Sequence, residues 1–227
     1  VQEARTSIES YWQDRAASFG MAHSGQGAWG DLVQLALPPT CGPASAGDSF
    51  AYAADREDRA QAHAQRILDV GTGPGAVALE MAARGHIVTG VDLSANMVEH
   101  ARENARTAGL TVTFATADAA DLPFAPESFD VVVSRDVMWN MTDPEGALTS
   151  WVSVLRPGGR IIYFDADWHG YLLNEAADRL RRAFYTDGGN PRFYEMERVA
   201  RTLPLTEAPR PAWDVDCLER LGCEVLA

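Results

Sequence analysis

The sequence predicts an α/β fold in which a doubly wound, mainly parallel sheet carries helices on both faces. An apolar run, Ile67 to Val70, leads directly into three glycines at alternate positions, and a helical composition begins at Ala76. Apolar runs typical of strands then alternate with helical segments as far as Asp165. Because parallel strands need a crossover between them, usually a helix, this alternation favours a parallel sheet.

The expected elements follow one another in a regular order. Ser94 and Asp143 stand where two of the helices should begin, and Pro144 suits a first helical position. In order, we expect strand Ile67–Val70, helix Ala76–Arg84, strand Ile87–Val91, helix Ala95–Ala108, strands Thr111–Ala115 and Phe129–Ser134, helix Pro144–Leu155, a turn at Pro157-Gly158-Gly159, and strand Arg160–Asp165.

The segments on either side of this core have a different character. Amphipathic spacing predicts a helix over Thr6–Phe19, and aromatic residues gather between Trp168 and Tyr194. Further helices are expected over Trp29–Leu37, Arg56–Gln65 and Val215–Leu221, and a strand from Cys223. The predicted parts are a helical cap or lid over 1–60, the core over 61–166, a helical substrate-pocket insertion over 167–212, and a return to the core sheet over 213–227.

Composition limits the classes of partner. With 32 acidic and 19 basic side chains, the net charge of -13 disfavours nucleic acid and anionic lipid. The three cysteines lack metal-ligand spacing, and no apolar run approaches the roughly 20 residues that span a bilayer. We expect a cytoplasmic protein with no metal centre and no membrane span, acting on a small molecule as a monomer or a homodimer.

Polar residues gather where the predicted strands end. Ligands of open parallel sheets bind outside the carboxyl ends of the strands. Asp69 ends the first strand and Asp92 the second, whereas Asp118 follows the third. Ser134, Arg135 and Asp136 follow the fourth strand, and Asp165 ends the fifth. The binding edge is therefore expected to be acidic.

Two ligands compete for this edge. The spacing Gly71-x-Gly73-x-x-Ala76 with Asp92 downstream fits a dinucleotide fingerprint. S-adenosylmethionine accounts for more residues: Asp92 would hold the ribose hydroxyls, Asp118 and the Ala119 amide would read the adenine edge, and Leu93 and Met97 would pack on the ring. Asp69 suits the ammonium and sulfonium of that ligand, whereas a pyrophosphate would be repelled there.

Four stretches in sequence order resemble the motifs of class I S-adenosylmethionine-dependent methyltransferases. They are Ile67-Leu-Asp-Val-Gly-Thr-Gly-Pro-Gly75, Val88-Thr-Gly-Val-Asp-Leu-Ser94, Ala117-Asp-Ala-Ala-Asp-Leu-Pro-Phe124 and Leu155-Arg-Pro-Gly-Gly159. The likeness is to the small-molecule branch, similar to the quinone-biosynthesis methyltransferases. It implies a Rossmann-like sheet of seven strands, the last antiparallel, and S-adenosylhomocysteine as a product. The sequence stops within the expected sixth strand, so we expect the last strand to be missing from it.

Further cofactor contacts are expected from the glycine turn, the cap and the fourth strand. The turn contributes Gly71, Thr72, Gly73 and Gly75, and the fourth strand contributes Ser134 and Arg135. In the cap, Tyr11 would close over the cofactor and Arg15 would reach the methionine carboxylate. The alternative for Tyr11 and Trp12 is that they only fix the first helix to the core.

The acceptor side is predicted from aromatic residues and histidines after the fourth and fifth strands. Trp139, Trp168, Tyr171 and Tyr185 would form a substrate wall, unless they are ordinary core aromatics. If methyl transfer uses a base, the choice is His169 with Asp167 orienting it, and His23 in the cap loop is the second candidate.

These residues together predict methyl transfer to a small molecule, achieved mainly by proximity and orientation, with an optional base. The accepting atom can be oxygen, nitrogen, sulfur or carbon. The alternatives are an NAD(P)-dependent oxidoreductase on a Rossmann fold and a non-catalytic binding protein of the methyltransferase fold.

Overall fold

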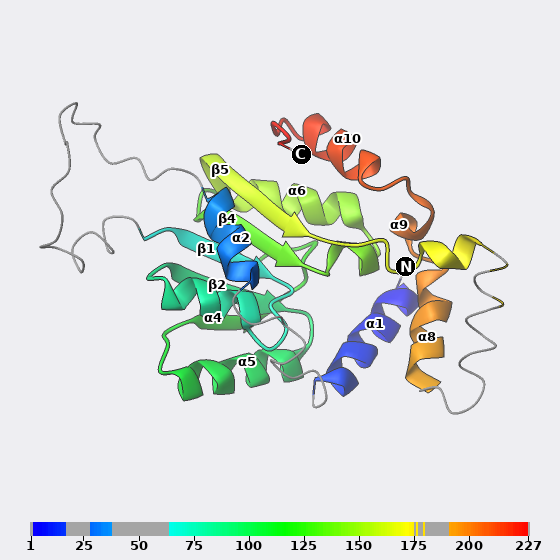
Figure 1. Cartoon of the computed structure of the whole chain (residues 1–227), viewed down its shortest axis with the longest axis horizontal. Helices are drawn as coiled ribbons and strands as arrows, with labels where there is room; N and C mark the ends of the chain where they lie inside the picture. The colour runs from blue at the N-terminus through cyan, green and yellow to red at the C-terminus, as the bar shows by residue number, and fades with distance from the viewer. Residues whose placement is uncertain are drawn as a thin grey trace, which may run out of the picture.

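The computed structural model describes residues 2–16, 28–37, 64–174, 176, 179 and 191–226. Within these residues five parallel strands form one sheet in the order β3-β2-β1-β4-β5. Figure 1 shows the sheet at the centre of the molecule. The bounds are β1 Arg66–Val70, β2 Ile87–Asp92, β3 Thr113–Thr116, β4 Phe129–Arg135 and β5 Leu155–Phe164. The prediction of a doubly wound parallel sheet is confirmed.

Helices connect and flank these strands, and their starts agree with the capping residues expected from the sequence. The Ser94 hydroxyl accepts the Met97 amide at 3.2 Å, and the Asp143 carboxylate accepts the Gly146 amide at 2.9 Å. The described helices are α1 Gln2–Arg15, α2 Ala28–Ala36, α4 Ala76–Ala83, α5 Ala95–Ala108, α6 Pro144–Val154, α8 Pro191–Ala200, α9 Pro204–Glu207 and α10 Ala212–Arg220, with 3-10 helices η2 Met138–Asn140 and η3 Gly170–Leu173.

The sheet buries an apolar layer on each face. Successive side chains of a strand point to opposite faces, so Ile67 packs into one layer and its neighbour Leu68 into the other. The first layer lies beneath α2, α4 and α5, and the second beneath α6 and α10 (Figure 1). Trp151 of α6 is fully buried in the second layer. Burial of these apolar side chains is the main force that holds the helices on the sheet.

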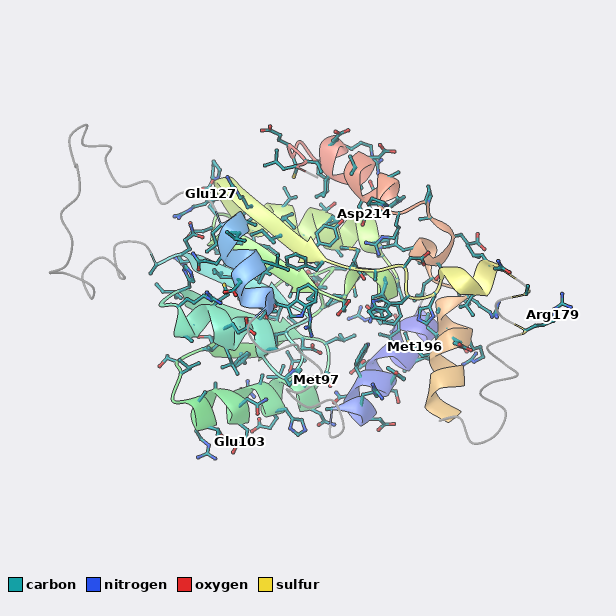
Figure 2. The ribbon with its side chains drawn as sticks, viewed as in Figure 1. Met97, Glu103, Glu127, Arg179, Met196 and Asp214 are labelled. Atoms are coloured by element: carbon teal, nitrogen blue, oxygen red, sulfur yellow. The ribbon has the colours of Figure 1, made fainter. Side chains whose placement is uncertain are left out.

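A third apolar cluster lies outside the sheet and joins two segments that are far apart in the sequence. Ile8 of α1 packs with Met196 and Val199 of α8 and with Leu203. Figure 1 shows α1 and α8 side by side, beyond the ends of the strand arrows, and Figure 2 labels Met196 on α8. The N-terminal helix and the segment after β5 therefore meet on the side of the sheet where ligands of this architecture bind.

The structure departs from the sequence-based expectations at several element ends. Strand β5 begins at Leu155, because Leu155 pairs with Phe129 before the expected turn at 157–159 bulges out and Arg160 pairs with Val131. The strand expected at Cys223–Leu226 is wrong: these residues have no ladder partner, and a strand needs one. Helix α1 starts and ends about one turn earlier than expected.

The segment before β1 and the expectation of no membrane span are considered next. The expected helix over Arg56–Gln65 lies mostly outside the described residues, and residues 64 and 65 are not helical. In the ranges given above, no helix has the length and apolar character needed to cross a bilayer.

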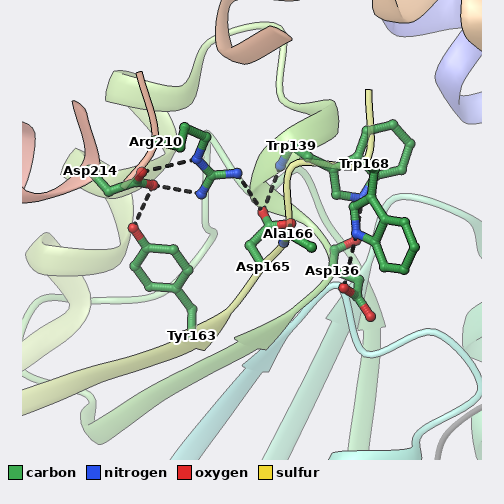
Figure 3. Close-up of polar contacts among 8 residues, drawn as sticks. All are labelled: Asp136, Trp139, Tyr163, Asp165, Ala166, Trp168, Arg210 and Asp214. Atoms are coloured by element: carbon green, nitrogen blue, oxygen red, sulfur yellow. Dashed lines mark hydrogen bonds and ion pairs between the residues drawn. The ribbon is translucent and has the colours of Figure 1, made fainter. Parts of the chain in front are cut away.

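A polar network ties the C-terminal part of the chain to the end of β5. The Asp214 carboxylate accepts two hydrogen bonds from the Arg210 guanidinium, at 2.6 and 2.9 Å, and one from the Tyr163 hydroxyl at 2.7 Å (Figure 3). Arg210 also lies 3.3 Å from Asp165, whose side chain is 2% exposed. Burial raises the pKa of Asp165 to about 6, an effect that the charge of Arg210 opposes.

We expect Arg210→Ala to destabilise the protein by about 3–5 kcal/mol, because it leaves two carboxylates in a water-poor site without their cation. The matched control is Arg220→Ala, which removes an exposed ion pair to Glu145 and should cost less than about 1 kcal/mol. Urea denaturation at neutral pH measures both. Equal losses in the two variants would show that the network contributes little to stability.

Candidate functional site

A pocket lies at the carboxyl ends of the strands, where the order of the sheet reverses between β1 and β4. This reversal point is the usual ligand site of an open α/β sheet. Helix α1, the turn after β1, the ends of β2 and β4, the loop after β3 and η2 all contribute to its wall. The predicted cofactor residues that line it are Asp69, Gly71, Thr72, Gly73, Asp92, Leu93, Met97, Asp118, Ala119 and Arg135.

The glycine turn is held tightly against β2. The Thr72 amide donates to the Val91 carbonyl, the Gly73 amide to the Asp92 carboxylate, and the Gly75 amide to the Thr72 carbonyl, each at 2.9 Å. Three amides of the turn are therefore already bonded within the protein. A phosphate cradle would need such amides to point at the ligand.

Asp69 is buried beneath this turn at the end of β1. Its Oδ2 accepts hydrogen bonds from the Thr72 hydroxyl at 2.7 Å and from the Ala78 amide at 3.1 Å. Burial raises the pKa of this carboxyl to about 6, although the two hydrogen bonds and the charge of Arg135 oppose the rise. A cationic ligand in the pocket would favour the ionised carboxylate and relieve part of the cost of burying it.

Asp92 stands at the end of β2 with both carboxylate oxygens oriented by backbone amides. Oδ2 accepts from Gly73 at 2.9 Å and Oδ1 from Ser94 at 2.8 Å. Burial raises the pKa of Asp92, and these two bonds lower it. Because each carboxylate oxygen can accept a further hydrogen bond, the arrangement suits a pair of neighbouring hydroxyls.

Asp118 lies across the pocket, in the loop after β3. Its Oδ1 accepts the Ala120 amide at 3.0 Å, and its Oδ2 forms an ion pair with Arg5 of α1 at 2.7 Å. The neighbouring residue Ala119 is anchored by its carbonyl, which accepts Trp151 Nε1 at 3.0 Å. In the parts of the chain that the structure describes, no three potential metal ligands gather at one point.

Helix α1 covers the pocket. Ile8 and Trp12 line it, and the Gln13 side-chain oxygen accepts the Ser94 hydroxyl at 3.1 Å and the Asn96 amide at 3.0 Å. With the Asn140 amide group oriented to satisfy both its neighbours, its oxygen accepts Trp12 Nε1 at 3.0 Å. Together with the Arg5 ion pair, these contacts attach α1 to both sides of the pocket.

Four predicted cofactor residues do not line the pocket. Tyr11 packs edge-on against Trp12, with ring centroids 5.2 Å apart, and Arg15 is the last residue of α1. The Ser134 hydroxyl donates to the Val70 carbonyl at 2.8 Å and so fastens β4 to β1. Gly75 caps α4, and a Cβ there would press on Ala101 and Phe114, so this glycine serves close packing of α5.

Sequence reasoning missed several residues that do line the pocket. The spacing of Ile8 and Trp12, one helical turn apart, was the signal that these two share a face. Asp136 had been placed at the binding edge but given no role, and no pattern indicated Val137, Asn140 and Met141, because they follow β4 in an irregular stretch and around η2.

The predicted acceptor residues gather at a second, smaller hollow beside the pocket. Trp139, Asp167, Trp168 and His169 line it together with Leu205, Thr206 and Arg210. The Trp139 and His169 rings are 4.9 Å apart, and His169 is 9% exposed. Tyr171 belongs to η3, but its side chain, like His23 and Tyr185, lies outside the described residues.

The end of β4 lies between the pocket and this hollow. Arg135 lines the pocket and lies over the ring of Trp29, with its Cζ 5.3 Å from the ring centroid. Asp136 also lines the pocket and has a left-handed backbone, with φ 57°. Arg135 is the cation among the described residues of the pocket wall, next to a set of carboxylates.

Most residues that line this pocket lie in a segment that is similar to known proteins. Residues 68–163 match a family model described as a methyltransferase domain. Methyltransferase GfsG of Streptomyces halstedii is 37% identical over 124 residues, which are 53% of this chain and 44% of that protein. The ubiquinone/menaquinone biosynthesis C-methyltransferase UbiE of Geotalea daltonii is 37% identical over 113 residues, 48% of each chain. The chain thus aligns with less than half the length of each relative, and the resemblance stated from the four motifs is confirmed.

Solved structures support the fold. A candidate methyltransferase of Bacillus halodurans has a TM-score of 0.54 and 24% identity, covering 72% of this chain and 64% of that chain. A candidate S-adenosylmethionine-dependent methyltransferase of Methanococcus maripaludis has a TM-score of 0.50 and 21% identity, covering 71% and 70%. At these identities the likeness concerns the fold alone.

The glycine turn can be tested by substitution. Gly71 has φ +69°, and a Cβ there would overlap the Val137 side chain, whereas Gly85 has φ +90° and open space around its Cβ position. The left-handed backbone should cost about 1–2 kcal/mol in both alanine variants. The overlap should add about 1–3 kcal/mol in Gly71→Ala only. Equal free energies of unfolding for the two variants would contradict the tight fit of the turn.

Proposed function

We propose that this chain, which carries a methyltransferase domain over residues 68–163, transfers a methyl group from S-adenosylmethionine to a small molecule. One observation supports the proposal above all others. A single pocket brings together carboxylates from the ends of three strands, Asp69, Asp92 and Asp118, which stand far apart in the sequence. Carboxylates of this kind suit a ligand that carries both cationic and hydroxyl groups.

The chemistry of the pocket residues fits S-adenosylmethionine. Asp92 would accept the two ribose hydroxyls, and Asp118 with the Ala119 amide would bind the adenine edge. Leu93 and Met97 would pack on the ring; Figure 2 labels Met97, which belongs to the first turn of α5. At the other end, Asp69 would stabilise the ammonium, and we assign Arg135 to the carboxylate because it lines the pocket and Arg15 does not.

A dinucleotide fits this pocket less well. Its pyrophosphate would lie at the glycine turn, next to the carboxylate of Asp69, which repels negative charge. Three amides of the turn are not free to neutralise it, since those of Thr72, Gly73 and Gly75 donate to protein oxygens. These contacts favour a methyltransferase over the nucleotide-dependent oxidoreductase that the glycine spacing alone would allow.

The chain's contribution to the reaction is alignment and exclusion of water. The bound cofactor supplies an electrophilic methyl group on its sulfonium. Ile8 and Trp12 of α1 cover the pocket, and the contacts of Arg5 and Gln13 keep the helix in place. A covered site holds the acceptor in line for displacement and keeps water from competing.

The acceptor is inferred to be a small molecule with an apolar or aromatic body. Trp139 and Trp168 lie beside the β4 end of the pocket, and the matched relative from Geotalea daltonii is named for quinone biosynthesis. Tyr171, Tyr185 and His23 remain predicted members of this side, and His169 with Asp167 remains the base predicted from sequence. No methyl transfer to any member of a metabolite panel would favour a non-catalytic binding protein.

Binding of S-adenosylhomocysteine tests the cofactor assignment. Calorimetry on the wild type should give a micromolar-range dissociation constant, and Asp92→Ala should weaken it by about 100-fold, since the ribose hydroxyls lose a charged acceptor. Asp121→Asn, a change at an exposed aspartate in the same loop as Asp118, is the control and should bind like the wild type. Tighter binding of NADH than of S-adenosylhomocysteine would overturn the proposal.

The pH dependence of S-adenosylmethionine binding tests the role of Asp69. In the free protein its raised pKa stabilises the fold below about pH 4, and that contribution is lost as the pH rises through about 6. A bound cation lowers this pKa, so binding releases a proton below about pH 6. Affinity should therefore rise up to about tenfold per pH unit between about pH 5 and 6, and then level off.

The control for this profile is Asp69→Asn, which should bind more weakly at neutral pH and show no rise between about pH 5 and 6. A wild-type profile that is already flat over this range would contradict a cation beside Asp69.

A further inference from the structure

Asp136 is a carboxylate of the pocket to which the proposed cofactor contacts give no role. Among the described residues that line the pocket, the carboxylates are those of Asp69, Asp92, Asp118 and Asp136. The first three come from the ends of β1 and β2 and the loop after β3, the half of the sheet assigned to the cofactor. Asp136 follows β4 on the other side of the reversal point, where an acceptor would approach the methyl group.

The backbone of Asp136 is held in an unusual conformation by its neighbours. Its φ of 57° is uncommon for a residue with a side chain. Its amide donates to the Phe164 carbonyl at 2.8 Å, and its carbonyl accepts Trp139 Nε1 at 2.9 Å. Residues held in this way occur preferentially at functional sites, because the surrounding contacts must offset the strain.

One carboxylate oxygen of Asp136 accepts a hydrogen bond from a neighbouring side chain. Trp168 Nε1 donates to Oδ1 at 3.1 Å, as Figure 3 shows. The other oxygen, Oδ2, lies 3.6 Å from Arg135 Nε, which is longer than a hydrogen bond. This contact is an ion pair, and with its side chain 39% exposed, Asp136 can present Oδ2 to a ligand while Oδ1 keeps its bond to Trp168.

The base predicted from sequence has a different position. His169 lines the second hollow with its ring tilted against that of Trp139, and it is not among the residues that line the pocket. The indole of Trp168, which bonds to Asp136, is half exposed at 51% and offers an apolar surface beside the carboxylate. The β4 side of the pocket therefore pairs a hydrogen-bond acceptor with an aromatic face.

We propose that Asp136 receives the methyl acceptor, and that the acceptor carries a hydroxyl or amino group next to an aromatic or apolar body. This inference rests on the proposed function. The acceptor's O–H or N–H donates to Asp136 Oδ2, and its body packs on Trp168. Trp168 also positions the carboxylate, because its Nε1 donates a hydrogen bond to Asp136 Oδ1.

The step balances in atoms and charge. A lone pair on the acceptor oxygen or nitrogen forms the new bond to the methyl carbon as the carbon–sulfur bond breaks, and that bonding pair remains on sulfur. The sulfonium thereby becomes a neutral thioether. The acceptor's proton, which would otherwise remain on a cationic oxygen or nitrogen, passes to Asp136 and from there to water. An acceptor that reacts as a preformed thiolate or carbanion has no O–H or N–H to donate to this carboxylate.

Methylation of small model acceptors by the whole chain tests this proposal. Tritiated S-adenosylmethionine is offered with catechol and 4-methylphenol for hydroxyl acceptors, aniline and benzylamine for amines, thiophenol for sulfur, and a 1,3-diketone for carbon. The wild type should methylate a hydroxyl or an amine probe. Asp136→Asn should lower kcat for that probe by about 100-fold or more, and Trp168→Phe, which keeps a ring but loses the donor, by about tenfold.

Binding provides a second readout that does not depend on turnover. Catechol, or the best amine probe, is titrated into the protein saturated with S-adenosylhomocysteine. Asp136→Asn should weaken this binding about tenfold while the dissociation constant of S-adenosylhomocysteine changes less than threefold. Asp216→Asn on the exposed side of α10 is the matched control and should leave every value unchanged.

Each outcome decides between the alternatives. Methylation of the thiol or carbon probe only, methylation of no probe, or an Asp136→Asn enzyme with wild-type kcat overturns the assignment of Asp136. A loss that follows His169→Asn but spares Asp136→Asn returns the role to His169. Failure of the wild type to bind S-adenosylhomocysteine instead contradicts the proposed function, which separates the two hypotheses.

Discussion

The buried carboxylate of Asp69 is the interaction on which the rest of the site depends. Through one oxygen it bonds the Thr72 hydroxyl in the glycine turn and the Ala78 amide in the first turn of α4. It thus joins the end of β1, the turn and the next helix in one rigid unit. The cost of burying a charge is visible in its raised pKa, and a cationic ligand is the partner that would offset that cost.

The cover of the pocket depends on contacts that no single segment makes alone. Helix α1 is held by Gln13 at the start of α5, by Arg5 at Asp118, and by apolar packing on α8. Because α1 and α8 pack against each other over the strand ends, a change in either segment should be felt in both. The Arg5 ion pair also lies at the position assigned to adenine, so cofactor binding and the position of α1 are expected to influence each other.

The residues at and beyond the ends of β4 and β5 stabilise the fold and also hold the backbone of Asp136. Asp165, Arg210, Asp214 and Tyr163 form a buried network that fastens the C-terminal helix to the sheet, and Asp165 also accepts the Trp139 amide at 2.7 Å. Trp139 in turn bonds the carbonyl of Asp136. The structural network therefore supports the backbone on which Asp136 faces the pocket, a common relation between a buried polar cluster and a reactive side chain.

The sequence by itself determined the sheet, its helices, the glycine turn and the acidic strand ends, because these depend on apolar periodicity, capping and backbone freedom among neighbouring residues. Ser94, Asp92 and Gly71 were readable in this way. Only the tertiary structure decided that Trp12 rather than Tyr11 lines the pocket, and that Asp136 rather than His169 lines it near the end of β4. The same is true of the ion pair between Arg210 and Asp165. These outcomes depend on how distant segments pack, which local patterns do not encode.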